Sequence, residues 1–331
     1  MTAAGPVRLA VVGVGHLGRQ HARVAAGLPD VRVVGVQDIL PGRAAEVARE
    51  LGLTALPDLE SVAREADAAV VATPTASHAE VASYLLRRGR DVLIEKPVTS
   101  TVAEADQLLA LARAGGRILQ VGHVERYNPA VEAAFGLLSQ PRFVEVDRLG
   151  AFTGRSTDVD VVRDLMIHDL QMVLELVGRP VREIRAAGLA VLTDRLDIAN
   201  ARIAFEGGCI ASLTASRVSL EKTRKFRVFA PALYVSIDML TRSVTAFRLS
   251  RDRGTPEVVP VTLPVDPEEP LKRELEDFAR CVRERSRPRV PGEAGRDALA
   301  LADRVREAIE EHRRAVEREG QGGGQGGGAA S

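Results

Sequence analysis

The sequence is poor in several residues on which particular kinds of site depend. Only two cysteines, Cys209 and Cys281, occur among its 331 residues. Two cysteines cannot form a disulfide framework, so we expect a reducing, cytoplasmic setting in which both are small buried apolar side chains. The closely spaced Cys and His ligands of a zinc site are also absent, and we therefore expect no bound metal.

No strong excess of charge or of apolar residues occurs along the chain. Basic and acidic residues both number 45, giving a formal net charge of zero, which argues against a nucleic-acid partner. No apolar run approaches the roughly 18 residues of a membrane span. The N-terminus lacks the charged, apolar and small-residue regions of a signal peptide. These absences favour a cytoplasmic protein that acts on a small molecule.

Lysine is rare in comparison with arginine. Only Lys96, Lys222, Lys225 and Lys272 occur among the 45 basic residues, which a GC-rich genome would explain. Arginine cannot replace lysine where a compact or titratable ammonium must act. A lysine that persists at the end of an apolar strand, as Lys96 does, therefore suggests a chemical role.

The length predicts two domains, because 331 residues exceed one compact core. Over residues 1–122, short apolar runs alternate with helical patterns, which is typical of a parallel sheet flanked by helices. Thr101 and Glu104 fit a capping box. The predicted strands are 7–12, 31–36, 68–72, 92–94 and 118–121, and the predicted helices lie near 17–28, 41–51, 77–88 and 101–114.

Residues 123–317 follow a different pattern, which predicts an α+β domain with an open, largely antiparallel sheet. Gly207 and Gly208 lie between two alternating runs and indicate a hairpin turn. Apolar stripes over 271–282 and 301–316 predict two final helices, and the Gly-rich residues 318–331 are expected to be disordered. We also expect helices near 129–138 and 159–177, and strands near 142–149, 182–192, 198–206, 209–218, 224–230, 233–239 and 243–249.

A glycine-rich motif after the first predicted strand indicates a dinucleotide site. Residues 13–18 read G-V-G-H-L-G, which matches G-x-G-x-x-G, with a helix pattern following. Gly13 permits the tight turn, Gly15 lets the backbone approach a pyrophosphate, and Gly18 allows close helix–strand packing. The helix N-terminus offers N–H groups to the phosphates. A purely structural glycine turn is the alternative. The residues assigned to the cofactor here are Gly13, Gly15, His16, Leu17 and Gly18.

Asp38 lies at the end of the next predicted strand, twenty residues after Gly18. At this position a carboxylate accepts hydrogen bonds from the ribose hydroxyls, and its charge repels a 2′-phosphate. We therefore expect NAD as cofactor and NADP as the weaker ligand. Arg43 lies just downstream and could soften this preference. The alternative is that Asp38 caps a helix or lies in a solvated loop.

Two further strand ends carry polar residues. Thr73 and Pro74 follow one strand, with His78 nearby, and Glu95-Lys96-Pro97 ends another. Ligands in open α/β sheets bind beyond the carboxyl ends of the strands. Each segment alone fits an ordinary loop, but together with the glycine loop they predict one cofactor crevice. The residues assigned to it are Thr73, Pro74, His78, Glu95, Lys96 and Pro97.

Several motifs together make the sequence similar to a known family. They are the glycine loop, T-P-T-A-S-H at 73–78, E-K-P at 95–97, Asp164-x-x-x-His168, and V-P-G-x-x-G at 290–295. The chain resembles the family of glucose–fructose oxidoreductase, inositol 2-dehydrogenase and rhizopine catabolism proteins (Gfo/Idh/MocA). The resemblance implies a Rossmann domain followed by a domain with an open sheet, often used to form a homo-oligomer, here a dimer or tetramer. It also implies that Lys96, Asp164 and His168 act at the nicotinamide. Met166 departs from the family's frequent glycine.

A narrower resemblance concerns residues 121–129, V-G-H-V-E-R-Y-N-P, and 163–169, R-D-L-M-I-H-D. These segments look like the subgroup that oxidises carbon 3 of UDP-N-acetylglucosamine. In that subgroup the 3-keto sugar passes to an aminotransferase during lipid A biosynthesis. The resemblance thus implies a nucleotide-sugar substrate.

The three residues implied by the family suit the oxidation of a hydroxyl. Asp164 and His168 are spaced i, i+4, so on a helix the carboxylate can orient the imidazole and stabilise its protonated form. With an ordinary pKa of about 6.5, His168 can remove a hydroxyl proton near neutral pH. Lys96 can stabilise the developing alkoxide. The alternative for Asp164 and His168 is a surface pair or cap.

Polar residues follow the last predicted Rossmann strand, where a substrate pocket should open. A polar interdomain linker is the alternative. Guanidinium groups bind phosphates bidentately, so Arg155, Arg217 and Arg224 are candidates for the pyrophosphate, although each also fits a solvated surface position. The residues assigned to the substrate are His123, Arg126, Tyr127, Asn128, Arg155 and His168.

Three functions remain open at this point. The first is an NAD-dependent dehydrogenase of a sugar or nucleotide sugar, best fitted by UDP-N-acetylglucosamine. The second is a dehydrogenase of a free polyol or sugar such as inositol or glucose. The third is a non-catalytic protein that senses NAD(P), against which the joint presence of Lys96, Asp164 and His168 argues.

Overall fold

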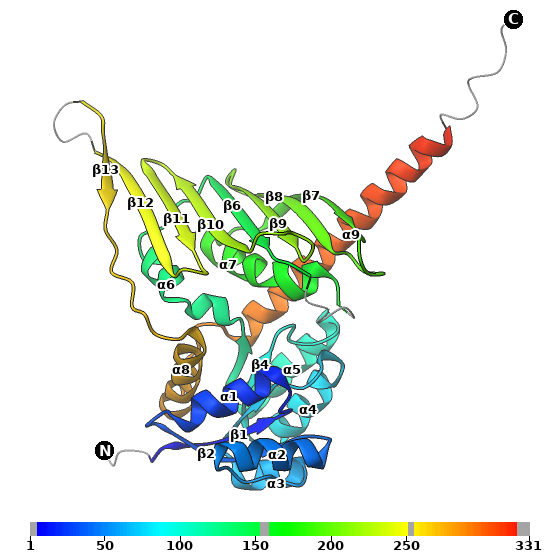
Figure 1. The fold of residues 1–331 in the computed structure, drawn as a ribbon, viewed down its shortest axis with the longest axis vertical. Helices are drawn as coiled ribbons and strands as arrows, with labels where there is room; N and C mark the ends of the chain where they lie inside the picture. The colour runs from blue at the N-terminus through cyan, green and yellow to red at the C-terminus, as the bar shows by residue number, and fades with distance from the viewer. Residues whose placement is uncertain (1–4, 153–158, 251–254, 323–331) are drawn as a thin grey trace, which may run out of the picture. The chain divides into compact units, whose positions relative to one another are not determined.

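The computed structural model describes residues 5–152, 159–250 and 255–322 (Figure 1). The chain forms two compact units. The first comprises Met1–Glu132 and Asp266–Leu299, and the second comprises Ala133–Val265 and Ala300–Ser331. No helix in the described part of the chain is both long enough and apolar enough to span a membrane.

The first unit contains the predicted parallel sheet. Its five strands follow the order β2-β1-β3-β4-β5, and every neighbouring pair is parallel. The strands are β1 (Val7–Val12), β2 (Val31–Gln37), β3 (Ala68–Val71), β4 (Asp91–Glu95) and β5 (Leu119–Gly122). The helices are α1 (His16–Ala26), α2 (Pro41–Leu51), α3 (Leu59–Glu65), α4 (Thr75–Arg87) and α5 (Val102–Gly115). All five predicted strands and four predicted helices are confirmed, and α3 was not predicted.

Strand alternation divides the core of this unit into two apolar clusters. On β1, Leu9 and Val11 belong to one cluster, whereas Ala10 and Val12 belong to the other. Both faces of the sheet are therefore covered, as expected for parallel strands that read as continuous apolar runs. The predicted capping box of α5 is present, because Thr101 and Glu104 each accept the other's backbone N–H.

Helix α8 (Pro270–Glu284) belongs to the first unit, whereas the sequence assigned it to the second domain with residues 123–317. Its apolar side chains Leu275, Phe278 and Val282 pack in the same cluster as Leu9 and Val11 of β1. The stripe over 271–282 correctly predicted the helix. It could not predict the surface that buries this stripe, because that surface lies far away in the sequence.

The second unit contains an open eight-stranded sheet in the order β13-β12-β11-β10-β6-β9-β8-β7 (Figure 1). All neighbouring strands are antiparallel except β6 and β9. Gly207 and Gly208 join β8 to β9 with φ values of 84° and 86°, which confirms the predicted hairpin turn. The strands are β6 (Phe143–Leu149), β7 (Val181–Leu189), β8 (Ile198–Phe205), β9 (Ile210–Ser216), β10 (Thr223–Ala230), β11 (Leu233–Asp238), β12 (Ser243–Ser250) and β13 (Glu257–Val261).

One face of this sheet is buried, as β9 demonstrates. Ala211, Leu213 and Ala215 are buried, and they alternate with the partly exposed Ser212 and Thr214. Edge strand β13 was not predicted, because it is mostly exposed and contains a proline.

The remaining helical segments of the described chain include two irregular turns. A π-helical turn, η2 (Val162–Met166), leads directly into α7 (Ile167–Val177). A 3-10 turn, η1 (Val124–Tyr127), precedes α6 (Pro129–Phe135). The last helix, α9 (Gly292–Gly322), includes the first residues of the segment expected to be disordered, and residues 323–331 lie outside the described chain.

Candidate active site

The glycine loop joins β1 to α1 in the first unit. Gly13 has a φ of 81°, and a Cβ atom there would lie 2.7–2.8 Å from atoms of Thr73. A Cβ at Gly18 would lie 1.8 Å from the carbonyl oxygen of Gly13. At Gly15 nothing lies within 4 Å of such an atom. Two glycines are therefore required by backbone conformation and packing, and the third leaves open space beside the loop.

The N-terminus of α1 carries no side-chain cap. Its N-cap residue is Gly15, and no acidic residue lies in the first turn. The first N–H groups of a helix have no partner within the helix, and with the positive end of the helix dipole they bind anions. The exposed His16 and Leu17 form the start of this helix. The loop thus has the features needed to hold a pyrophosphate.

Asp38 is fixed beside this loop at the carboxyl end of β2. One carboxylate oxygen accepts the N–H of Val14 at 2.9 Å, and the other accepts the N–H of Leu40 at 2.9 Å. The Asp38 side chain is nearly buried, and the exposed Arg43 guanidinium lies 3.8 Å from it. The N-cap residue of α2 is Leu40 and Asp38 is nearly buried, so the carboxylate neither caps that helix nor lies in a solvated loop, and it is held next to the glycine loop.

His78 connects the loops that follow the other two strands. It is 1% exposed, and its ring nitrogens lie 2.8 Å from the carbonyl oxygen of Thr73 and 2.9 Å from that of Pro97. Burial lowers the pKa of His78 despite these two contacts. His78 thus links the two loops, and its assignment to the cofactor stays a prediction. Pro74 precedes α4 as its N-cap residue and is exposed.

Glu95 is the last residue of β4 and Lys96 follows it, and the two side chains differ in their exposure to solvent. Glu95 is buried, and its carboxylate accepts the backbone N–H of Lys96 at 3.1 Å and lies 2.7 Å from Nε2 of His21. Burial opposes ionisation, but the hydrogen bond and charge of His21 hold the pKa of Glu95 below its ordinary value. Lys96 is partly exposed and precedes a cis peptide bond to Pro97. Glu95 therefore supports Lys96 from within the protein.

The segment after β5 is mostly buried. His123 is 1% exposed, and burial, together with the charge of Lys96, lowers its pKa to about 3. The Tyr127 hydroxyl donates to Asp277 of α8 at 2.9 Å, and Asn128 accepts the N–H of Ala130 at the start of α6. These hydrogen bonds hold the segment, and the substrate contacts expected of Tyr127 and Asn128 stay predictions. Arg126 is partly exposed.

In the second unit, Asp164 and His168 lie on one continuous helical segment. Asp164 belongs to the π-helical turn η2, and His168 belongs to the first turn of α7. Met166 and Ile167 between them are fully buried. The π turn was not predicted, and such turns frequently occur at functional sites.

The first turn of α7 is anchored by a buried ion pair that the sequence did not reveal. Arg148 of β6 donates from Nε and Nη2 to the two carboxylate oxygens of Asp169, each at 2.7 Å. The two side chains are 3% and 2% exposed. Because Asp169 adjoins His168, this pair fixes the backbone that carries the imidazole.

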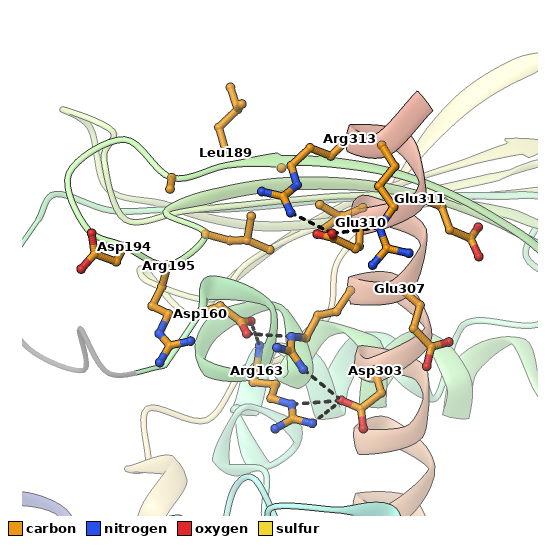
Figure 2. Close-up of a pocket in the computed structure, with 16 residues that line it drawn as sticks. Asp160, Arg163, Leu189, Asp194, Arg195, Asp303, Glu307, Glu310, Glu311 and Arg313 are labelled. Atoms are coloured by element: carbon orange, nitrogen blue, oxygen red, sulfur yellow. Dashed lines mark hydrogen bonds and ion pairs between the residues drawn. The ribbon is translucent and has the colours of Figure 1, made fainter. Parts of the chain in front are cut away.

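A second set of ion pairs fixes the π turn against α9 (Figure 2). Arg163 donates to Asp303 at 3.0 and 2.6 Å, and Arg306 lies 2.8 Å from Asp160. Asp160 also accepts the N–H groups of Val162 and Arg163 at 3.0 Å. These residues border a pocket of about 810 Å³. Its lining carries charges of both signs, and the ion pairs described above use several of them, so it does not resemble an anion site.

The three arginines proposed to bind a pyrophosphate lie in different surroundings. Arg155 lies outside the described residues. Arg217 is 7% exposed, donates to the carbonyl oxygen of Val159 and lies 3.6 Å from Asp197. It therefore holds the chain internally. Arg224 lies in β10, directly opposite Arg148 of β6.

Comparison with known proteins identifies the family. The model of the oxidoreductase family with an NAD-binding Rossmann fold (Gfo/Idh/MocA) matches residues 7–123, and the model of the Gfo/Idh/MocA C-terminal domain matches residues 131–231. The chain belongs to the Gfo/Idh/MocA family. It is thus an oxidoreductase, and the glycine loop described above belongs to an NAD-binding Rossmann fold.

Individual relatives extend the match over nearly the whole chain. UDP-N-acetylglucosamine 3-dehydrogenase of Acidithiobacillus ferrooxidans is 38% identical over 92% of this chain and 97% of its own length. A solved structure of that enzyme superposes with a TM-score of 0.86, at 37% identity, over 93% of this chain and 99% of the other. The scyllo-inositol 2-dehydrogenase (NAD(+)) of Bacillus subtilis is 29% identical over 64% of this chain and 68% of its own.

Proposed function

We propose that this protein is an NAD-dependent dehydrogenase that oxidises the 3-hydroxyl of UDP-N-acetylglucosamine to a ketone. The observation that carries the proposal is the 38% identity, over 92% of this chain, to an enzyme named for that reaction. The segments 121–129 and 163–169, which resemble the subgroup with this substrate, lie within the described residues. A 3-keto nucleotide sugar is a substrate for an aminotransferase, so the product would supply a diamino sugar for lipid A or another surface polymer.

The catalytic roles are assigned to the residues that the family motif matches. His168 accepts the proton of the sugar hydroxyl, and Asp164 orients the imidazole and stabilises its positive charge. Lys96 donates a hydrogen bond to the oxygen as negative charge develops there. A bound nicotinamide would supply the hydride acceptor for this oxidation. The anchored first turn of α7 supports this assignment, because Arg148 and Asp169 fix the backbone at His168.

The cofactor contacts follow from the geometry of the first unit. The uncapped N-terminus of α1 and the open space at Gly15 fit a pyrophosphate. Asp38, held by Val14 and Leu40, presents a negative charge where a 2′-phosphate would have to lie. We therefore assign NAD as the preferred cofactor, and Arg43, 3.8 Å from the carboxylate, as the residue that moderates the preference.

A second candidate substrate is a free polyol. It is supported by relatives named as inositol 2-dehydrogenases, of which one is 29% identical over 64% of this chain. The two candidates differ in the diphosphate, which a polyol lacks. Incubation with NAD and a panel of nucleotide sugars and polyols, followed by absorbance of NADH, distinguishes them. Oxidation of inositol without any response to UDP-N-acetylglucosamine would overturn the nucleotide-sugar proposal.

We also propose that copies of the chain associate through the outer face of the open sheet. Phe143, Phe229, Tyr234 and Phe247 are direct cross-strand neighbours on β6, β10, β11 and β12. Successive ring centroids lie 5.8, 5.1 and 6.4 Å apart. Phe229 and Phe247 are 39% and 38% exposed. Such a row of aromatic side chains on an uncovered face is typical of a protein interface.

A further inference from the structure

Three ionisable side chains lie close together inside the first unit, and one of them contacts the backbone of Lys96. They are His21 of α1, Glu95 at the end of β4 and Glu274 of α8, and they are 0%, 7% and 0% exposed. One nitrogen or oxygen atom from each lies within 4.8 Å of the others. The three residues are far apart in the sequence, so only the packing of α1 and α8 against the sheet brings them together.

Glu95 connects this buried cluster to Lys96. One carboxylate oxygen lies 2.7 Å from Nε2 of His21, and the other accepts the backbone N–H of Lys96 at 3.1 Å. On the far side, a Cβ atom at Gly122 would lie 3.0 Å from the Glu95 carboxylate. Glu95 therefore fits tightly, with both oxygens used, and its position fixes the backbone at Lys96.

Glu274 differs from Glu95 in the hydrogen bonding of its carboxyl group. Among the described residues, neither of its carboxylate oxygens has a hydrogen-bond partner. Gln120 donates to the backbone carbonyl of Glu274 at 3.1 Å and leaves the carboxyl group unsatisfied. An ionised carboxylate without partners is very costly in such a place, and a second carboxylate close by adds repulsion. Burial, followed by the charges of Glu95 and Asp277, raises the pKa of Glu274 well above its ordinary value.

We propose that, in the cluster of His21, Glu95 and Glu274, Glu274 is a neutral carboxylic acid and Glu95 carries the negative charge. In this arrangement Glu95 is a positioning residue for Lys96, a role that depends on the proposed function. The state of Glu274 does not depend on it. The charged or titratable groups that face the cluster from neighbouring elements are Lys96 after β4, His78 of α4, His123 and Tyr127 after β5, and Asp277 of α8.

A divalent cation is the competing occupant, because one imidazole and two carboxylates form a possible ligand set. Two observations favour a proton. Glu95 is already hydrogen-bonded to His21 and to the N–H of Lys96, so neither oxygen is free for a metal. The cluster also lies next to the ammonium of Lys96, whose charge affects Glu95 and would oppose a further cation.

Two isosteric variants of the full-length protein separate these possibilities. Glu274→Gln preserves the neutral shape, so we expect an unchanged kcat. Glu95→Gln removes the negative charge, so we expect kcat to fall by about tenfold to a hundredfold, with the Kd of NAD unchanged, because Lys96 is misplaced. Equal losses of kcat in both variants, or a loss only in Glu274→Gln, would overturn the proposal.

Infrared difference spectroscopy tests the cluster without turnover. At neutral pH, the wild-type protein should show the carbonyl stretch of a protonated carboxylic acid, and Glu274→Gln should lack it. If that variant does not fold, the same band is sought in wild-type protein containing isotope-labelled glutamate. Absence of the band, or a stoichiometric divalent metal in the purified protein by mass spectrometry, would overturn the proposal. A positive band together with no activity on any sugar would refute only the proposed function.

Discussion

Arg148 donates two hydrogen bonds of 2.7 Å to Asp169, and both side chains are almost completely buried. Removing one member leaves an uncompensated buried charge, which costs about 3–5 kcal/mol. We therefore expect Arg148→Met to lower the free energy of unfolding by that amount in urea denaturation. Asp303→Asn, which breaks a pair that is about one quarter exposed, is the matched control and should cost about 1 kcal/mol or less. Equal losses in the two variants would contradict the anchoring role of Arg148.

Asp38 should determine the choice between NAD and NADP. In Asp38→Ala the charge that repels a 2′-phosphate is lost, so the ratio of the two dissociation constants should approach one. The variant also loses the acceptor for the N–H of Val14, so NAD binding itself should weaken. Calorimetric titration with both cofactors measures this. Wild-type protein that binds NADP as tightly as NAD would show the assignment to be wrong.

His123 should make the protein less stable in acid. Its folded-state pKa is about 3, against an ordinary value of 6.5, because burial and Lys96 disfavour the imidazolium. The unfolded chain therefore binds a proton below pH 6.5 that the folded chain does not, and stability falls as the pH is lowered. For this group the loss is about 2 kcal/mol at pH 5. Urea denaturation at pH 5 and 7.5 should show a smaller difference for His123→Gln than for the wild type, and an equal difference would refute this cause.

Glu274 should change the stability of the protein with pH in the direction opposite to that of His123. Its pKa is raised from 4.5, so above that pH the folded chain retains a proton that the unfolded chain has lost. Stability from this source therefore falls as the pH rises, until the folded-state pKa is passed. Glu274→Gln should become more stable relative to the wild type as the pH increases from 5 to 8. A constant difference between the two proteins over this range would contradict a raised pKa.

Lys96 and His168 should be required for turnover but not for cofactor binding. We expect Lys96→Met and His168→Ala each to lower kcat by orders of magnitude, since interactions made with developing charge contribute about 2–4 kcal/mol per group. Asp164→Asn should be milder, because His168 can still accept a proton. NAD titration provides the control for folding. Near-normal turnover in either of the first two variants would remove that residue from the mechanism.

The parts of the fold that the sequence predicted are those with strong local patterns. The strands of the first unit are continuous apolar runs, and Gly207 and Gly208 adopt the positive φ values that their turn requires. The misses have weak patterns. Helix α3 has only seven residues, and β13 is exposed along most of its length. The π turn at 162–166 has no signature that separates it from an α-helix.

The parts of the candidate site that belong to a sequence motif were predictable, whereas contacts between residues far apart in the sequence were not. The glycine loop and Asp38 follow each other closely along the chain, and the structure brings them together. The contacts of His78 and Tyr127 were not predictable, because their partners, Pro97 and Asp277, lie elsewhere in the sequence. The ion pair of Arg148 with Asp169 and the cluster around Glu95 were not predictable either, because their members are also far apart in the sequence.

Oxidation of UDP-N-acetylglucosamine at carbon 3 is tested most directly by a coupled assay. The purified protein is incubated with the nucleotide sugar, NAD, an amino donor and an aminotransferase that accepts 3-keto nucleotide sugars, with Lys96→Met as the blank. Because the 3-keto product is unfavourable on its own, we expect a small burst of NADH without the aminotransferase and sustained NADH with it. The product should be a diamino nucleotide sugar, identified by mass spectrometry. No diamino product, together with ready oxidation of a free polyol, would contradict the proposed substrate.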